Sequence, residues 1–177
     1  MKQLLTYMIF LVVASVNHTA LANQDLARWS ELNTSGHVSE LIQTGDDNRI
    51  QLQQTGIQQR AYVEQAEHMN AAWLSQTGQH NELTLLQQGT LNHFEATQHG
   101  EGNSMISQQY GQENIANLYQ HGLDNEIVVA QQGQLNEIAI QQIGSENQAI
   151  INQNGFGLSA NIQQQGHQQR LYVQQGF

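Results

Sequence analysis

The stretch QHGLDNEIVVAQQGQLNEIAIQ, residues 120–141, contains one eleven-residue pattern twice in succession. Each copy begins with Gln, places Gly two positions later and Asn five positions later, and carries apolar residues seven and nine positions after the Gln. In the first copy Gln120 is followed in this way by Ile127 and Val129. An apolar spacing of two residues is typical of a β-strand with one buried face, so each copy predicts one strand.

The pattern extends in both directions and fills residues 43–174 with twelve consecutive units, which indicates a repeat architecture. The repeated Gln residues are Gln43, Gln54, Gln65, Gln76, Gln87, Gln98, Gln109, Gln120, Gln131, Gln142, Gln153 and Gln164. The repeated Asn residues, replaced in three units by Gln59, Leu158 and Gln169, are Asn48, Asn70, Asn81, Asn92, Asn103, Asn114, Asn125, Asn136 and Asn147. The repeated Gly residues, with Glu67 as the one exception, are Gly45, Gly56, Gly78, Gly89, Gly100, Gly111, Gly122, Gly133, Gly144, Gly155 and Gly166.

The glycines lie in short segments such as Thr44-Gly45-Asp46-Asp47, which predict tight turns between the strands. A helical repeat is the alternative, but it would carry an interior Gly in nearly every unit, at about 1 kcal/mol each relative to Ala. The sequence therefore predicts an all-β fold, a β-solenoid of cross-β, amyloid type with about six coils of 22 residues. A degenerate strand over 37–42 precedes the first unit and brings the expected number of strands to thirteen.

Residues 22 positions apart stack in this fold, so the repeated Gln and Asn side chains lie above one another in columns. We expect these columns to be structural hydrogen-bonded ladders, because each amide both donates and accepts and a buried column satisfies itself along the stacking axis. Only an endless stack satisfies both ends of such a ladder.

The N-terminus predicts an export signal, with an apolar stretch from Leu4 to Val16 and a small-residue cleavage pattern at Ala20-Leu21-Ala22. We place cleavage after Ala22, which divides the chain into a signal peptide at 1–22, a lead segment at 23–36 and the repeat solenoid at 37–177. A membrane anchor is the alternative, but a span needs about 20 apolar residues. We expect a mature protein that is periplasmic or extracellular.

The composition excludes several classes of function. Four Arg against fifteen acidic residues give residues 23–177 a formal charge of −11, which disfavours nucleic acid and anionic lipid as partners. The absence of Cys excludes a disulfide framework and thiolate chemistry. The 32 Gln and 16 Asn, with 11% charged residues, are not typical of a soluble enzyme. The absence of Pro leaves every segment free to pair in a sheet.

The motif Gln-x-Gly-x-x-Asn followed by alternating apolar positions, in 22-residue double units behind a secretory signal, resembles the curlins of bacterial curli fibres. The resemblance covers residues 39–175. It implies a secreted amyloid subunit of the biofilm matrix that acts in adhesion, with no enzymatic activity and no cofactor. It also implies export from a Gram-negative bacterium through an outer-membrane pore with accessory factors, then polymerisation at the cell surface by self-association and with a homologous major subunit.

Two subunit types exist in that family, and the lead segment favours one of them. The Gly-rich start of the major subunit is absent, whereas Asp25-Leu26-Ala27, Ser30-Glu31 and the run at 38–41 look similar to the minor, nucleating subunit. We expect the minor type, and the major fibre subunit is the alternative. The sequence departs from the minor type at its C-terminus, where a basic last repeat is expected and Arg170 is the single basic residue.

Other function classes require residue columns that the sequence lacks. A carbohydrate-cleaving β-helix needs converging carboxylates, yet acidic residues such as Glu82 and Asp124 fall at outward or turn positions. A soluble ligand- or ice-binding solenoid is the alternative of another class, and an ice-binding face needs long Thr columns that do not form here. His99 and His121 are 22 apart and predict a stacked imidazole pair, but no third ligand joins them, so we expect no metal site. We also expect no catalytic residues and no small-molecule substrate.

One outward column breaks the alternation of polar and apolar residues. In one sheet it contains Thr84 together with Tyr62, Ile106, Val128, Ile150 and Tyr172. Exposed apolar stripes mark interaction sites, which makes this column a candidate lateral contact between fibres or with another subunit. General β-propensity on an exposed face is the alternative explanation.

Overall fold

The structure, a computed structural model, describes residues 8–11, 20–21 and 36–176. The predicted signal peptide at 1–22 and lead segment at 23–36 therefore lie largely outside the described residues. All elements within the described ranges are strands, as the repeat predicts. They are β1 (Met8–Leu11), β2 (Ala20–Leu21), β3 (Val38–Asp46), β4 (Arg49–Ile57), β5 (Arg60–His68), β6 (Ala71–Gln79), β7 (Glu82–Thr90), β8 (His93–Glu101), β9 (Ser104–Gln112), β10 (Ile115–Leu123), β11 (Glu126–Gln134), β12 (Glu137–Ser145), β13 (Gln148–Phe156), β14 (Ser159–His167) and β15 (Arg170–Gly176).

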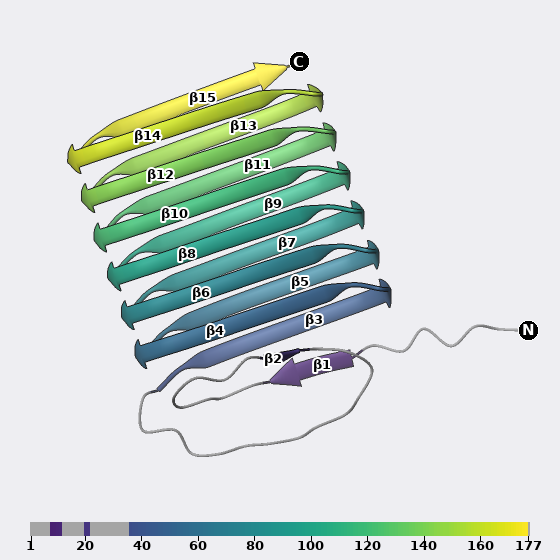
Figure 1. Ribbon diagram of the computed structural model, residues 1–177, viewed down its shortest axis with the longest axis horizontal. Helices are drawn as coiled ribbons and strands as arrows, with labels where there is room; N and C mark the ends of the chain where they lie inside the picture. The colour runs from purple at the N-terminus through teal and green to yellow at the C-terminus, as the bar shows by residue number, and fades with distance from the viewer. Residues whose placement is uncertain (1–7, 12–19, 22–35, 177) are drawn as a thin grey trace, which may run out of the picture.

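Successive strands from β3 to β15 alternate between two facing sheets, so the chain climbs as a solenoid from one end of the stack to the other (Figure 1). One sheet has the order β1-β3-β5-β7-β9-β11-β13-β15, and the other has the order β2-β4-β6-β8-β10-β12-β14, with β1 and β2 antiparallel to their neighbours. From β3 onward each strand pairs in parallel with the strand two along the chain, in a register that places Gln131 on Gln109 and Gln142 on Gln120. The predicted β-solenoid with coils of 22 residues is confirmed.

The first residue of each two-residue turn adopts a left-handed backbone conformation. Its φ lies between 51° and 68° at Asp47, Gln58, Met69, His80, Leu91, Gly102, Glu113, Asp124, Leu135, Glu146, Gly157 and Gln168. Backbone hydrogen bonds between coils hold these turns, as where the Met69 N–H donates to the Asp46 carbonyl at 3.0 Å. The turns therefore belong to the stack and are not formed by local sequence alone.

The core is a narrow column between the two sheets. Side chains seven and nine positions after each repeated Gln point inward, and most are completely buried, including Leu85, Phe94, Met105 and Ile127. The repeated Gln follows on the same face of the strand, because it lies two residues after the second apolar position. Each coil therefore presents apolar residues at the middle of its cross-section and amides toward its two corners.

Candidate functional site: amide ladders and stack edges

Two unbroken glutamine ladders run the length of the stack. In the sheet that contains β3, each Gln donates from Nε2 to Oε1 of the Gln in the next coil, at 2.7 Å for the Gln87–Gln109 pair and 2.9 Å for the Gln109–Gln131 pair. The members of this ladder are Gln43, Gln65, Gln87, Gln109, Gln131, Gln153 and Gln175. The members of the ladder in the opposite sheet are Gln54, Gln76, Gln98, Gln120, Gln142 and Gln164.

Most of these amides are completely buried, and from Gln65 and Gln76 onward each also donates from Nε2 to a backbone carbonyl. Gln109, for example, also donates from Nε2 to the His93 carbonyl at 3.0 Å and to the Asn114 carbonyl at 3.3 Å. The ladder thus ties strand to turn and coil to coil at the same time. Burial of an unpaired amide would cost about 1–3 kcal/mol, so the column is stable because its members are consecutive.

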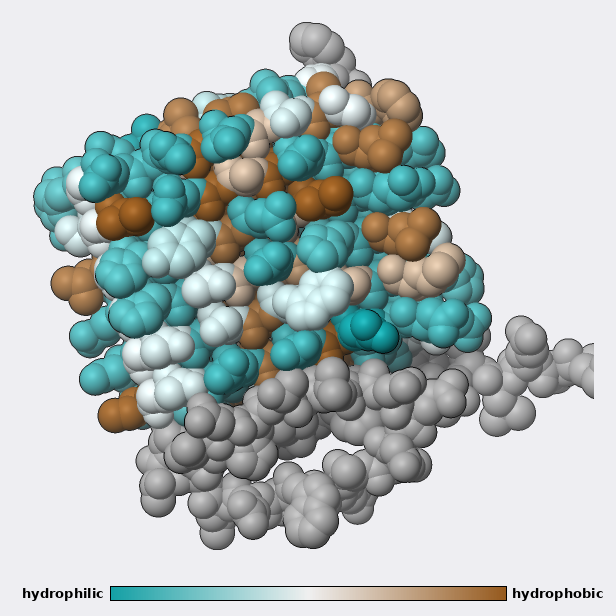
Figure 2. All heavy atoms as spheres, viewed as in Figure 1, coloured by the Kyte–Doolittle hydropathy of each residue, from teal (hydrophilic) through white to brown (hydrophobic). Residues whose placement is uncertain are grey.

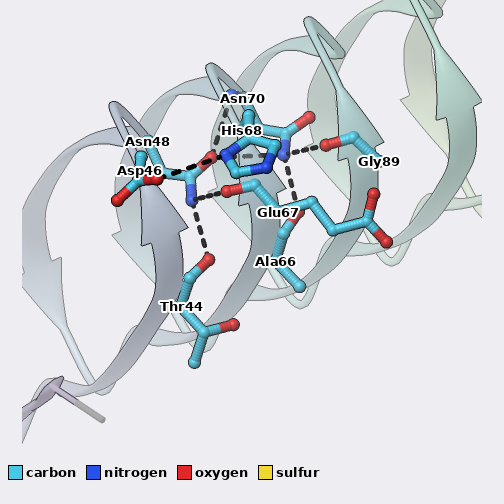
Figure 3. Close-up of polar contacts among 8 residues, drawn as sticks. All are labelled: Thr44, Asp46, Asn48, Ala66, Glu67, His68, Asn70 and Gly89. Atoms are coloured by element: carbon cyan, nitrogen blue, oxygen red, sulfur yellow. Dashed lines mark hydrogen bonds and ion pairs between the residues drawn. The ribbon is translucent and has the colours of Figure 1, made fainter. Parts of the chain in front are cut away.

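The repeated asparagines form two further columns at the corners (Figure 3). Asn70 donates from its backbone N–H, at 2.9 Å, and from Nδ2, at 3.2 Å, to Oδ1 of Asn48 one coil below. Its Nδ2 also donates at 2.8 Å to the carbonyls of Ala66 and Gly89. One side chain therefore joins three successive coils, which explains why Asn recurs at this position.

The two kinds of ladder have opposite polarity. Gln side chains donate toward the C-terminal end of the stack, whereas Asn side chains donate toward the N-terminal end. At the C-terminal end Gln164 and Gln175 are the last ladder members, and at the N-terminal end Gln43 and Gln54 present acceptor oxygens. Ser39 hydrogen-bonds to the Gln54 oxygen at 2.6 Å. The two ends are therefore complementary in donor and acceptor character.

The repeated glycines have a packing reason that the sequence did not suggest. They lie at the next-to-last position of each strand and not in the turn where we expected them. The turn consists of the two residues that follow the last residue of the strand. A Cβ at Gly111 would lie 2.0 Å from the carbonyl oxygen of Gly133 in the next coil, and φ at Gly111 is 116°. With φ in this range the position has no room for a Cβ beneath the next coil, which explains why Gly recurs there.

Glu67 is the one residue that replaces a glycine of this column. It has a φ of 77°, below the range of 99° to 157° in the repeated glycines. Its carbonyl still accepts a hydrogen bond of 3.0 Å from Nδ2 of Asn48, so the corner is intact (Figure 3). A side chain in this conformation is strained by about 1 kcal/mol or more, which makes this unit less stable than its neighbours.

The N-terminal end of one asparagine column departs from the pattern at Gln59, which the repeat already shows as a replacement, and at His37, whose place in the column the sequence did not suggest. His37 takes the position of an Asn, is 2% exposed, and accepts the Gln59 N–H on Nδ1 at 3.2 Å, as an Asn oxygen does elsewhere. Burial lowers the pKa of His37, and a hydrogen bond with the Gly56 backbone opposes this shift. Gln59 is fully buried, and its Oε1 has no hydrogen-bond partner within the described residues. One extra methylene therefore interrupts the ladder between Gln59 and Asn81.

The C-terminal end is open. β15 and β14 are the last strands of their sheets, and each pairs on one side only. Leu158 and Gln169 replace Asn in the last two turns, and their backbone N–H groups donate to Asn136 and Asn147 at 3.1 Å. The ladders from below are thus completed, while the upper edges of β14 and β15 remain unpaired in the described part of the chain. Unpaired strand edges are templates for further strands.

The candidate lateral contact is a column in the structure as well. The strand registers stack Tyr62, Thr84, Ile106, Val128, Ile150 and Tyr172 in this order. Ile106 and Tyr172 are exposed, and the other four side chains of the column are half-buried. The Tyr62 hydroxyl donates to Glu64 at 2.8 Å, and this bond raises the pKa of Tyr62.

Other polar groups of the described residues form stacked pairs and small clusters on the surface of the solenoid. His99 and His121 stack with ring centroids 4.7 Å apart, as their spacing predicts, but the described residues contain no group of three ligating side chains that could hold a metal ion. Glu126 accepts a hydrogen bond from Gln148 at 2.6 Å in a depression along one corner of the solenoid, lined by turn residues and by the first residues of β11, β13 and β15. Hydrophilic side chains predominate over the face of the stack seen in Figure 2, with hydrophobic ones scattered among them. Within the described ranges, no helix has the length and apolar character needed to cross a membrane.

Comparison with known proteins adds nothing to this geometry. The chain matches no protein-family model, no curated protein and no solved structure. The function is therefore argued from the ladders and the edges.

Proposed function

We propose that this protein is a secreted structural subunit of extracellular amyloid fibres of the curli type, and that it polymerises by adding the coils of one copy to the stack edge of another. The observation that carries the proposal is the pair of glutamine ladders, which run unbroken through all coils and end at unpaired strands. Within the described chain, Gln164 and Gln175 lack the upper amide partner that every interior ladder member has. A second stack supplies that partner.

The edge strands also support assembly through their side chains. Soluble β-proteins blunt open edges with charge or Pro, but β14 contains no acidic residue, Lys, Arg or Pro, and β15 carries one charge at Arg170. The inward residues of β15 that pack on the core, Leu171 and Val173, are only half-buried because no strand covers them. Addition of a strand would bury them further, which favours association by about 25 cal/mol per Å² of apolar area.

Within this function we assign the chain the role of nucleating subunit for a homologous major subunit at the cell surface, in biofilm formation and adhesion. The lead segment 23–36 supports this role through its lack of a Gly-rich start. The role of major subunit is the alternative, and the two differ in whether the chain acts in catalytic amounts. A trace of the folded chain that shortens the lag of a Gly-rich homologue supports the nucleating role, and a lag that does not change supports the alternative.

The test of the fibre function is polymerisation of residues 23–177, which contain the whole buried core. Purified chain should convert without any ligand to thioflavin-binding fibres with a meridional reflection near the roughly 4.8 Å strand spacing. A chain that stays monomeric after long incubation and shows no such reflection would favour a soluble solenoid instead.

A matched pair of charge variants tests whether the edge is the active surface. Gln164→Glu with Gln175→Glu places carboxylates at the two ladder ends, where the side chains point inward. Gln163→Glu with Gln174→Glu adds the same charge to the same strands at exposed outward positions. The first pair should block elongation and the second should leave it nearly unchanged. Equal inhibition by both pairs contradicts an edge mechanism.

A further inference from the structure

Within the described residues, the number of strands formed by the repeat is odd. Thirteen strands, β3 to β15, make six and a half coils, so the sheet that contains β3 has one strand more than the sheet that contains β4. The stack therefore starts and ends in the same sheet. This property constrains how two copies can join, and the following inference rests on the proposed fibre function.

Two head-to-tail arrangements keep all strands parallel. In the unrotated arrangement β3 of a second copy stacks on β15, and its β4 then lies one strand position too high to reach β14. In the rotated arrangement the second copy turns by 180° about the solenoid axis, so that its β3 stacks on β14 and its β4 stacks on β15. Both arrangements preserve strand direction, because neighbouring strands of the solenoid run in opposite directions in the two sheets.

We propose that successive copies in the fibre are related by a 180° screw about the solenoid axis, with the N-terminal edge of one copy docked on the C-terminal edge of the previous one. Each copy then advances the fibre by six and a half coils, roughly 31 Å at about 4.8 Å per stacked strand. The eleven-residue unit makes this possible, because the two halves of a coil follow the same pattern and can exchange places.

The rotated joint continues both glutamine ladders. Gln164 at the end of one ladder faces Gln43 of the second copy, and Gln175 faces Gln54 of the second copy. Each pair is stacked as two Gln residues 22 positions apart are stacked inside one copy. The polarity fits, because Gln164 and Gln175 accept on Oε1 from the amides below them and so direct Nε2 toward the next copy. Gln43 and Gln54 donate from Nε2 to the coil above them and so direct Oε1 toward the previous copy, where the Gln54 oxygen also accepts from Ser39. The unrotated joint continues only one ladder and leaves Gln164 without an amide above it.

The rotated joint also stacks corner residues on corner residues and outward residues on outward residues, as inside one copy. Asn48 of the second copy stacks on Gln169, whose side-chain oxygen takes the place of an Asn oxygen. Asp46 of the second copy stacks on His167, which repeats the His68–Asp46 pair of 3.6 Å inside the stack. One contact opposes the joint, because Arg49 of the second copy lies beside Arg170, and like charges at directly stacked outward positions cost about 0.2–1 kcal/mol.

The unrotated joint would leave an empty strand position over β14. The backbone of β14 and the core residue Ile162 would remain uncovered on that side. The segment that precedes β3 does not carry the repeat that could fill the position, since Leu32 stands where Gln is required and Thr34 where Gly is required. A gap nine residues long inside a cross-β stack costs the backbone hydrogen bonds of a whole strand.

The N-terminal edge becomes available when residues 1–22 are removed. β1 pairs antiparallel with β3 over four residues and β2 pairs antiparallel with β4 over two, whereas the pairs from β3 onward extend over seven to nine. Both short strands belong to the predicted export signal. The joint is therefore a property of the chain that starts at Asn23.

Disulfide trapping tests the arrangement directly, because the chain has no Cys of its own. Ile42→Cys with Gln163→Cys places the two thiols on stacked outward positions of the rotated joint, and Ile42→Cys with Gln174→Cys does the same for the unrotated joint. Stacked residues in neighbouring strands are about 4.8 Å apart, within the Cα range of disulfides. Gln141→Cys with Gln163→Cys is the control, since these residues are stacked partners within one copy and should form an intrachain bond.

Fibres of each double variant are oxidised, dissolved in formic acid and run on a non-reducing gel. The rotated joint predicts a covalent ladder of oligomers for Ile42→Cys with Gln163→Cys and monomers for Ile42→Cys with Gln174→Cys. The inference is overturned by the reverse result, by ladders from both variants, or by ladders from neither while the control bond forms. All three outcomes require fibres and leave the proposed function standing, whereas a wild-type chain that forms no fibres refutes both.

Discussion

Substitution of one glutamine in the middle of a ladder tests the reasoning on stability most directly. Gln109→Leu replaces a completely buried amide by an apolar side chain of similar size, so the packing of the core changes little. The substitution leaves two buried amide groups of neighbouring coils without their ladder partners, Nε2 of Gln87 and Oε1 of Gln131. At about 1–3 kcal/mol for each orphaned group, the free energy of unfolding should fall by about 2–6 kcal/mol.

The ladder geometry makes a second prediction about three consecutive substitutions. When Gln87, Gln109 and Gln131 are all replaced by Leu, the groups left without ladder partners are Nε2 of Gln65 and Oε1 of Gln153, again two groups. The ladder part of the loss should therefore stay at about 2–6 kcal/mol, as in a single variant, while the bonds from each amide to backbone carbonyls are lost at every site. The total loss of the triple variant should therefore be smaller than the sum of the three single losses.

The assay is urea unfolding of residues 23–177, followed by far-ultraviolet circular dichroism below the concentration at which the chain associates. Leu at Gln51, Gln79 and Gln134, which lie on the outside of the coils, is the matched control and should change stability by no more than about 0.5 kcal/mol for each site. Single-site losses that add up in the triple variant would refute the ladder as a cooperative column. A control set as destabilising as the buried set would refute the facing of the strands.

Three further substitutions follow from individual contacts and use the same urea assay. Gly111→Ala should destabilise the chain by more than about 3 kcal/mol, because the new Cβ meets the carbonyl of the next coil. Gly157→Ala is the control, since a Cβ there has no atom within 4 Å and should cost only the strain of its positive φ, about 1 kcal/mol. Equal losses of stability in the two variants would exclude the clash. Gln59→Asn should stabilise the chain by about 1 kcal/mol net, because the shorter amide leaves no buried oxygen unpaired, and a loss of stability would contradict this. The pKa of His37 is lowered in the fold, so the stability that neutral His37 contributes is complete above about pH 6.5 and is lost as the pH falls toward the folded pKa. His37→Asn should therefore make the free energy of unfolding less dependent on pH between 7 and 5. An unchanged pH dependence would show that other groups cause it.

The columns could be predicted from the sequence because they depend only on period. Eleven-residue spacing places like residues 22 apart in the same column, and apolar residues at alternating positions determine which side of the strand faces the core. The stacking of Gln131 on Gln109 and of Asn114 on Asn92 can be predicted from these two patterns alone. The same argument gives the stacked pair of His99 and His121.

The turns could not be predicted in the same way. The residue with positive φ is Asp47 in one turn, Met69 in another and Leu91 in a third, and Met and Leu have no intrinsic preference for that conformation. The conformation is imposed by the corner Asn of the coil below, which accepts the backbone N–H of the next corner residue, and by backbone bonds to that coil, and both are tertiary contacts. The carbonyl that excludes a Cβ from the glycine position is also in another coil, so the sequence suggested a turn where the structure has the end of a strand.

The departures from the repeat concentrate in the terminal coils, and this affects the strength of a joint between copies. Interior corners have Asn above Asn, with two hydrogen bonds from each to the one below, as for Asn114 on Asn92. At the rotated joint His37 of the second copy lies above Leu158, which has no side-chain oxygen to accept such bonds. Since the glutamine ladders continue across the joint and one corner ladder does not, the joint is weaker than a step between interior coils by about the two missing hydrogen bonds. A fibre built in this way releases whole folded copies at its ends before any copy unravels.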